Sequence, residues 1–476
     1  MKLYQKEERV VTSKVRFQSA TLVRLSLSVL SAGALLMAGD TAGSTPTTKV
    51  PTFTKDIVPI LQARCQDCHR PNAMAPMSLL TYDETRPWAR SIKERVVKRQ
   101  MPPWHLDKSV GIQSFQNDMS LSDAQIATVV KWVDSGAPQG DPKDMPPPKT
   151  FPKEGEWQLE KIYGRPPDMI IKSDDYTMPA VSQDQWWKPV VDLNVKDDLW
   201  VKAVEMRPGT AAGRKITHHA LAHLIQSETD EKAIDGNDDA ALGQSGGTLM
   251  EWAVGKNYDI YRPDTGKLIR PGAKIWWDIH YHAVGEKITD HVELGVWLYP
   301  KDQKPKYRTY LTLFGATGNH LDIEPNTVNV TQGFHVLKAP AILGNFQPHM
   351  HLRGKAMLLE AIMPDGTTQT LSYVDHFNFN WMTNYIYTDD AAPVLPKGTV
   401  IHVTAWHDNT TANPFNPDPN QWVGGGDRTV DEMAHAWVNV TYISQEDYDK
   451  WAATHKKSNG RPTAALRNGA DPANNN

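Results

Sequence analysis

The sequence predicts a small α-helical unit followed by two antiparallel β-sandwiches. Helical apolar spacing surrounds a C-x-x-C-H motif between residues 53 and 136. A proline-rich stretch over residues 141–155 follows, which is typical of an extended spacer. From residue 156 onward, short alternating apolar runs bounded by Gly, Pro, Asn and Asp replace the helical pattern. That pattern indicates antiparallel sandwiches, and the stretch is long enough for two of them.

Composition and charge exclude several classes of protein. The chain has 476 residues, 40% of them hydrophobic and 22% charged, with a net charge of −4. These values are ordinary for soluble globular domains, and the length allows two to four of them. Because neither sign of charge dominates, nothing favours nucleic acid or an anionic membrane surface as a partner. The two cysteines fall in one motif, so disulfides do not staple the fold.

The N-terminus is typical of an export signal. Six basic residues between Lys2 and Arg24 precede an apolar run, Leu25–Gly39. This run is short for a membrane span and suits the hydrophobic region of a secretory signal. We expect residues 1–43 to be a signal peptide, with retention as a membrane anchor and a buried helix as the alternatives. A periplasmic or secreted bacterial location follows, with membrane contact only through an uncleaved N-terminal segment.

Residues 44–140 carry the haem motif. After a Ser/Thr/Pro-rich linker, a helical pattern over Phe53–Leu61 leads into Cys65-Gln-Asp-Cys68-His69. This spacing is the c-type haem attachment signature, in which both thiols form thioethers and the histidine binds iron. A zinc ribbon would need a second ligand pair, and a thioredoxin-like site would need a βαβ pattern. The motif therefore predicts one covalently bound haem c.

The distal haem ligand is expected to be Met101. Two prolines follow it and stiffen the backbone beside the thioether. Alternatives are Met74, Met77, Met119 and His105. A helix is predicted from Ser122, which forms a capping box with Gln125, to Gly136. Its apolar stripe is Ile126, Val129, Val130 and Val133. The segment resembles small cytochrome c domains, which implies His/Met ligation suited to electron transfer.

The remaining predicted elements lie in the β-rich part. Three strands are expected, over Leu199–Met206, Ile275–Tyr281 and Val292–Leu298. One helix is expected near Gln445–Thr454, and residues 451–476 are polar and expected to form a disordered tail.

Histidines cluster at four places in the β-rich part. The clusters are His218-His219, His280-Tyr281-His282, His349-Met350-His351 and Met433-Ala434-His435. Residues two apart on a strand share a face, whereas neighbours face opposite ways. His218 and His219 can therefore share a metal only if the backbone bends there. The lone histidines His291, His335, His376, His402 and His455 are expected to be ordinary core or surface residues.

The methionine decides which metal the sequence favours. Imidazole suits zinc, copper, iron or nickel, whereas a soft thioether selects Cu(I). If Met433 joins His349 and His351 as a ligand, the set favours copper, because zinc prefers Cys, Asp or Glu in that position.

Residues 160–445 resemble the copper type II, ascorbate-dependent monooxygenase family, which includes peptidylglycine α-hydroxylating and dopamine β-hydroxylating enzymes. Four short motifs occur in the family's order. They are His218-His219, Ile279-His280-Tyr281, His349-Met350-His351-Leu352-Arg353-Gly354-Lys355 and Asp431-Glu432-Met433. The resemblance implies two sandwiches, residues 156–318 and 319–450, which face a cleft and hold one copper ion each.

The resemblance also implies roles for individual residues. His218, His219 and His280 would hold an electron-transfer copper. His349, His351 and Met433 would hold the catalytic copper that binds dioxygen. His282 would not be a ligand, but would support the site or face the cleft.

Four departures from the family alter its expected chemistry. Gln347 stands where the peptide-amidating relative has an arginine that grips the substrate carboxylate. His435 and Trp437 replace an asparagine and a tyrosine. The family's disulfides are absent, and a haem segment precedes the sandwiches.

The resemblance implies an exported haem- and copper-containing monooxygenase. It would hydroxylate a C–H bond of a small organic substrate with O₂. Its electrons would come from an external donor, an ascorbate-like reductant or a redox protein, through the haem. The alternatives are an electron-transfer or copper-binding protein without an organic substrate, and a structural sandwich that has lost its metals.

Overall fold

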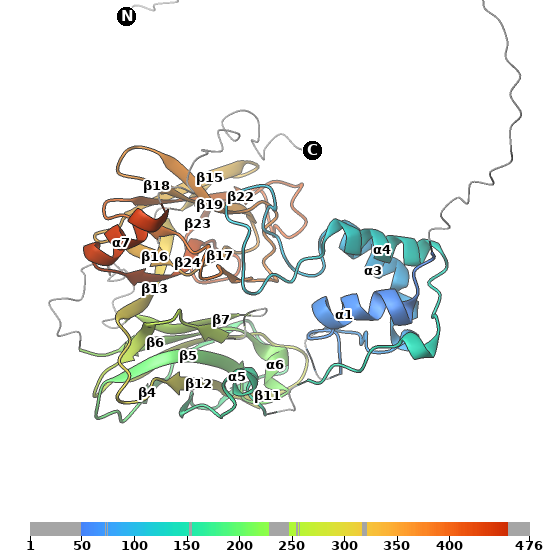
Figure 1. Ribbon diagram of the computed structural model, residues 1–476, viewed down its shortest axis with the longest axis horizontal. Coiled ribbons are helices and arrows are strands. Elements are labelled where there is room, and N and C mark those ends of the chain that lie inside the picture. The colour runs from blue at the N-terminus through green and yellow to red at the C-terminus, as the bar shows by residue number, and fades with distance from the viewer. Residues whose placement is uncertain are drawn as a thin grey trace, which may run out of the picture. The chain divides into compact units, whose positions relative to one another are not determined.

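The computed structural model describes residues 49–71, 73, 75–151, 155–227, 247–253, 256, 258–316 and 321–455. The expected signal peptide, Met74 and residues 456–476 of the expected tail lie outside these ranges. Among the described residues, no helix is both long and apolar enough to span a membrane. The described chain is mostly β-sheet arranged in sandwich-like layers, with few helices (Figure 1).

Short helices make up the described chain before the β-rich part. They are η1 (Phe53–Ile57), α1 (Val58–Arg64), α2 (Tyr82–Thr85), η2 (Arg86–Trp88), α3 (Ala89–Val97), α4 (Asp123–Asp134) and η3 (Pro142–Asp144). The helix predicted from Ser122 is confirmed as α4, and the capping box with Gln125 is present. Phe53, Leu61 and Trp132 are at most 2% exposed and centre a core shared by η1, α1 and α4. These helices therefore bury an apolar core of their own.

The next part, which we call the N-terminal sandwich, comprises β1–β12 with α5 and α6. Its elements are α5 (Gln158–Tyr163), β1 (Met169–Lys172), β2 (Tyr176–Met178), β3 (Gln185–Trp187), β4 (Val190–Asp192), β5 (Leu199–Pro208), α6 (Gly213–Ile216), β6 (Thr217–Ile225), β7 (Thr248–Ala253), β8 (Tyr258–Ile260), β9 (Thr265–Ile269), β10 (Lys274–Tyr281), β11 (Ile288–Asp290) and β12 (Val292–Leu298). The three predicted strands are confirmed as β5, β10 and β12. Its core joins apolar side chains of β5 and β12 to those of β6 and β10.

The C-terminal sandwich comprises β13–β24 and α7. Its elements are β13 (Tyr307–Ala316), β14 (Asp322–Ile323), β15 (Val328–Val336), β16 (Ala341–Leu343), β17 (Asn345–His349), β18 (Gly354–Ile362), β19 (Thr368–Val374), β20 (Tyr385–Ile386), β21 (Val394–Leu395), β22 (Val400–Asp408), β23 (Val423–Gly424), β24 (Ala434–Tyr442) and α7 (Gln445–His455). The boundary expected at 318/319 would leave β13 in the first sandwich, but β13 pairs along its length with β24, and it joins the two parts by also pairing with β7 and β9. A four-stranded sheet has the order β15-β22-β18-β19, while β24 pairs with β13, β16 and β17. The helix predicted near Gln445 is confirmed as α7.

Strand alternation on β6 and β10 turns one set of side chains away from the sandwich core. Ile275, Trp277, Ile279 and Tyr281 of β10 and Ala220, Ala222 and Leu224 of β6 belong to the core. The alternate positions therefore lie on the other face of this sheet. On that face Leu221 packs with Leu311, Leu313 and Trp437 of the C-terminal sandwich. The histidines of β6 and β10 therefore lie where the two sandwiches meet.

Candidate metal centres

Three histidines of the N-terminal sandwich converge. One ring nitrogen from each of His218, His219 and His280 lies within 4.8 Å of the others. The Nδ1 atoms of His218 and His219 are 3.1 Å apart. We call this set the three-histidine group.

A β-bulge explains how two adjacent histidines reach the same place. His280 of β10 lies opposite His219 of β6, whereas the next residue, Tyr281, lies opposite Thr217. His218 is therefore the extra residue on β6. A bulge inserts one unpaired residue and bends its strand. The bend that the sequence argument required is present at this position.

Asp184 bonds to two histidines, one of which belongs to the three-histidine group. Nε2 of His280 donates to Oδ2 of Asp184 at 2.9 Å, and Nδ1 of His282 donates to Oδ1 at 2.7 Å. His282 therefore contacts the carboxylate that supports His280. The other ring nitrogen of His280, Nδ1, is buried and has no hydrogen-bond partner. A carboxylate on one nitrogen with the other left open is the usual arrangement of a metal-binding histidine.

Aromatic rings fix the imidazole planes. The Trp186 ring stacks on His280 at 4.5 Å between centroids and 8° between planes. Trp186 pairs with His280 across β3 and β10, so the strand register produces this stack. Phe379 stacks on His218 at 5.1 Å. These contacts restrict ring rotation and preorganise the nitrogens.

A second group lies on β17 and β24, which pair through His349 and His435. In the same antiparallel register Gln347 lies opposite Trp437. Beyond the paired residues, the backbone N–H of His351 donates to the carboxylate of Glu432, the residue before Met433. The rings of His349 lie 5.4 Å from His351 and 6.2 Å from His435. His349, His351, Met433 and His435 all line one cavity. Strand pairing up to His349 and His435, together with the bond from His351 to Glu432, therefore places His351 and Met433 at one cavity despite their separation in sequence.

The backbone fixes the orientation of the second group. Nδ1 of His351 donates to the carbonyl of Asp431 at 3.0 Å, which leaves Nε2 for another partner. Glu432 accepts from the backbone N–H groups of His351 and Arg353 at 2.9 and 2.6 Å. Nε2 of His407 donates to the carbonyl of Met433 at 3.1 Å. In addition, Nδ1 of His435 is buried without a partner.

Burial keeps these imidazoles neutral, and neutral imidazole is the form that binds metal. Burial, with a smaller effect of His280, lowers the pKa of His218 to about 4. Burial also lowers the pKa of His219 and His349 well below the usual value, and that of His435 to about 3. The convergent nitrogens, the partnerless Nδ1 of His280 and the neutral rings fit a bound metal ion in the three-histidine group.

The two groups adjoin each other. The rings of His219 and His349 are 6.3 Å apart, and Phe379 contacts His351 at 6.0 Å as well as His218. His219 lines the same cavity as His349, and the cavity has a volume of about 760 Å³. That size is typical of sites for small organic molecules. We call this space the interdomain cavity.

The C-x-x-C-H motif begins at the C-terminal end of α1. The backbone N–H groups of Cys68 and His69 donate to the carbonyl of Cys65 at 3.2 and 2.9 Å, forming a tight turn. Nδ1 of His69 donates to the carbonyl of Met77 at 3.3 Å, so Nε2 is left as the ligand nitrogen. Burial raises the pKa of the Cys65 thiol to about 12. A reactive redox dithiol needs the opposite shift.

The candidate distal ligands lie in different surroundings. Met77 packs against the helical core that includes Cys65. Met119 packs instead against the core of the C-terminal sandwich, and the backbone N–H of His105 donates to the hydroxyl of Tyr385 in that sandwich. Met101 is half-buried just after α3, and its N–H donates to the carbonyl of Arg95 at 3.4 Å. Among the described alternatives, Met77 is therefore the one that shares a core with Cys65.

The lone histidines bond elsewhere. His291 pairs with Asp175, His376 with Asp375 and His402 with Glu360, and His335 and His455 bond to the backbone carbonyls of Gly315 and Trp451. Sequence reasoning missed Asp184, Phe379, Glu432 and His407 as neighbours of the groups. Asp184 has one local signal, its position two residues before Trp186 at the start of β3. Glu432 lies within the Asp431-Glu432-Met433 motif but was given no role, and Phe379 and His407 carry no motif that would mark them.

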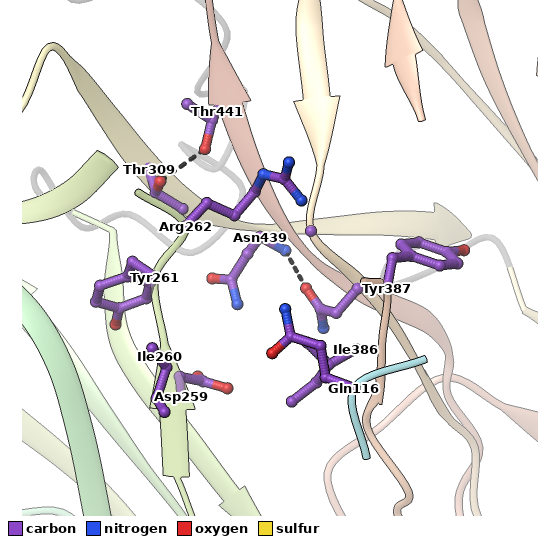
Figure 2. Close-up of a pocket in the computed structure, with 12 residues that line it drawn as sticks. Gln116, Asp259, Ile260, Tyr261, Arg262, Thr309, Ile386, Tyr387, Asn439 and Thr441 are labelled. Atoms are coloured by element: carbon purple, nitrogen blue, oxygen red, sulfur yellow. Dashed lines mark hydrogen bonds between the residues drawn. The ribbon is translucent and has the colours of Figure 1, made fainter. Parts of the chain in front are cut away.

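A separate small cavity of about 30 Å³ lies between Asp259–Arg262 of the N-terminal sandwich and Asn439 and Thr441 of the C-terminal one. Figure 2 shows its polar walls, including the Thr309–Thr441 hydroxyl contact of 2.7 Å. It has room for about one water molecule. It is therefore too small to be a substrate site.

Comparisons with known proteins add no identification. No protein-family model and no curated protein matches the chain. Among solved structures, one of the infectious bursal disease virus Gx strain is 10% identical, covers 58% of this chain and 74% of its own, and has a TM-score of 0.16. A putative α-L-fucosidase from Bacteroides ovatus is 7% identical, covers 66% of this chain and 43% of its own, and has a TM-score of 0.15. Likenesses at this level support no inference about fold or function.

Proposed function

We propose that the chain is an exported copper monooxygenase with an attached c-type haem. The observation that carries the proposal is that the three-histidine group adjoins the second group through His219 and His349, and that His219 lines the interdomain cavity together with His349, His351 and Met433. Neither a structural sandwich nor a simple copper carrier needs two adjoining candidate ligand sets beside a cavity of this size. The sandwiches would be the two copper-binding domains, and the helical unit would be the cytochrome c-like domain.

The proposed reaction inserts one oxygen atom into a C–H bond. Written in balance, R–H, O₂, two electrons and two protons give R–OH and water. The electrons would come from an external donor, a small ascorbate-like reductant or a redox protein. Bound copper and haem would supply one-electron redox chemistry and activation of O₂.

The chain's own residues prepare the two copper sites. His218, His219 and His280 would hold one ion. The bond from Nε2 of His280 to Asp184 leaves the buried Nδ1 of His280 as the ligand nitrogen. His349, His351 and Met433 would hold the other, and the thioether would favour Cu(I). His435 lies beside His349 and is a further nitrogen within this group. Two nitrogens and one sulfur leave a coordination position open, as catalytic sites require.

The haem would be held by Cys65, Cys68 and His69, with Met101 as the proposed distal ligand. The bond from His69 to the carbonyl of Met77 orients its imidazole and fixes the tautomer. Haem is attached covalently outside the cytoplasm, so this assignment and the N-terminal signal together support an exported protein.

Met433→Ala tests the proposal. Copper-loaded protein with chemically reduced haem is supplied with a panel of organic compounds, and uptake of isotopically labelled O₂ is measured with product mass. We expect labelled alcohol from the wild type and at least a hundredfold loss in Met433→Ala, with an unchanged haem spectrum. Met145→Ala, at a half-exposed methionine of the spacer, is the matched control.

Two outcomes would contradict the proposal. Full turnover by Met433→Ala would remove this residue from the site. Copper binding without substrate-dependent O₂ uptake would favour the electron-transfer or copper-binding alternative.

A further inference from the structure

The interdomain cavity extends beyond the candidate ligands, and its other walls are largely apolar. Aromatic and aliphatic side chains contribute from both sandwiches. They are Trp186, Leu221, Trp276, Leu313, Phe314, Leu321, Leu337 and Trp437. Most of these side chains are buried or half-buried. Ligand binding to such walls is favourable mainly because it removes apolar ligand surface from water.

Exposed apolar residues mark the margin of the cavity. Phe334 and Val336 of β15 both line it, and they are 57% and 62% exposed. Large apolar side chains left this open next to a cavity are typical of a ligand-binding surface. We therefore place the entrance beside the C-terminal end of β15.

The charged groups of the cavity wall are already engaged. Nζ of Lys188 lies 2.9 Å from Oδ2 of Asp278 and 4.0 Å from Oδ2 of Asp427. Oε2 of Glu251 accepts from Nε2 of Gln347 at 2.6 Å and lies 3.5 Å from Nζ of Lys256. Lys188 is thus shared by two carboxylates, and Lys256 is shared by Glu251 and Asp259. Acidic groups outnumber basic ones here, but each of these carboxylates already has a lysine partner.

The other charged side chains of the cavity wall, Glu432 and Lys338, offer a ligand ion no better partner. Glu432 is occupied by two backbone N–H groups. Lys338 is exposed to solvent, where its charge is screened. No arginine is among the described residues that line the cavity. A carboxylate would therefore lack a bidentate partner.

We infer that the interdomain cavity accepts a neutral, predominantly apolar organic molecule with an aromatic or branched hydrocarbon part. It enters past Phe334 and Val336 and lies against the apolar wall with one end toward His349 and Met433. This substrate class rests on the proposed function, but the binding step needs no metal. An ion of the same shape binds more weakly because its desolvation is not repaid.

Three compounds of one shape test the inference. They are 4-phenylbutanol, 4-phenylbutyrate and 4-phenylbutylamine, titrated by calorimetry into the full-length, copper-free protein. We expect the neutral alcohol to bind at least tenfold more tightly than either ion. Equal or tighter binding of an ion, or no binding of any of the three, would overturn the inference.

A pair of variants on β15 locates the binding. Val336 lines the cavity, whereas Val330 is 53% exposed on the same strand and does not line it. We expect Val336→Glu to weaken alcohol binding at least fivefold and Val330→Glu to leave it unchanged. Equal effects of the two substitutions on alcohol binding would show that the entrance does not lie at Val336. Because copper is absent, these results are independent of whether the proposed hydroxylation is observed.

Discussion

The two histidine groups differ in how they are built, and the difference suggests a division of labour. In the three-histidine group a bulge on β6 and the carboxylate of Asp184 bring together three nitrogens. In the second group, paired strands bring together two histidines, a methionine and His435, and backbone carbonyls fix the rings. A preformed nitrogen set suits an ion that only changes redox state. A softer, less complete set suits an ion that must also take an exogenous ligand.

The largest effect expected within this comparison concerns Asp184. Asp184→Asn keeps the size of the side chain but removes the charge that accepts from His280 and His282. We expect copper at the three-histidine group to bind 10- to 100-fold more weakly, about 1.4–2.7 kcal/mol, as is typical for such supporting carboxylates. Competition with a Cu(I) chelator measures this affinity.

A matched control is available on a neighbouring loop. Asp175 accepts from His291 at 3.0 Å, outside both groups. Asp175→Asn should leave both copper affinities unchanged. If Asp184→Asn also leaves them unchanged, the carboxylate does not support the group and the contrast between the two sites fails.

A smaller effect is expected at a buried histidine that belongs to neither metal-binding group, where burial acts without a metal. His223 lies on the same face of β6 as His219, bonds to Thr248 at 2.9 Å and belongs to neither group. Burial, with a smaller effect of Lys188, lowers its pKa to about 4, against about 6.5 in an unfolded chain. The neutral ring thus contributes its full stability above pH 6.5, and that stability is lost as the pH falls toward 4.

His223→Gln should therefore make the protein less sensitive to acid. Between pH 7 and pH 5 the copper-free wild type should lose about 2 kcal/mol more unfolding free energy than the variant. Urea unfolding at the two pH values measures the difference. An identical pH dependence would mean that folding does not lower the pKa of His223.

The sequence predicted the elements that depend on local patterns. The capping box at Ser122 and the alternation in Ile275–Tyr281 are local signals, and α4 and β10 follow them. Trp132 was left out of the predicted apolar stripe of α4, although it lies three residues after Val129 and therefore on the same face of the helix. It is fully buried and contacts Phe53 of η1, a long-range contact that the sequence pattern could not show.

The candidate site was partly predictable for the same reason. Spacing alone suggested that His349 and His351 act together, but it could not show that β17 and β24 pair in the register that faces Met433. Adjacent histidines on a regular strand would point apart. The bulge that reconciles His218 with His219 depends on pairing between β6 and β10. Asp184 becomes a neighbour of His280 only through pairing of β3 with β10.

Copper content per chain tests the central claim most directly. Metal analysis of the purified, copper-loaded wild type and of His219→Ala and His351→Ala should give two, one and one ions. Haem absorbance should be equal in all three, and His291→Ala should retain two coppers. A wild type without copper, or variants that keep both ions, would contradict the account of two adjoining copper sites.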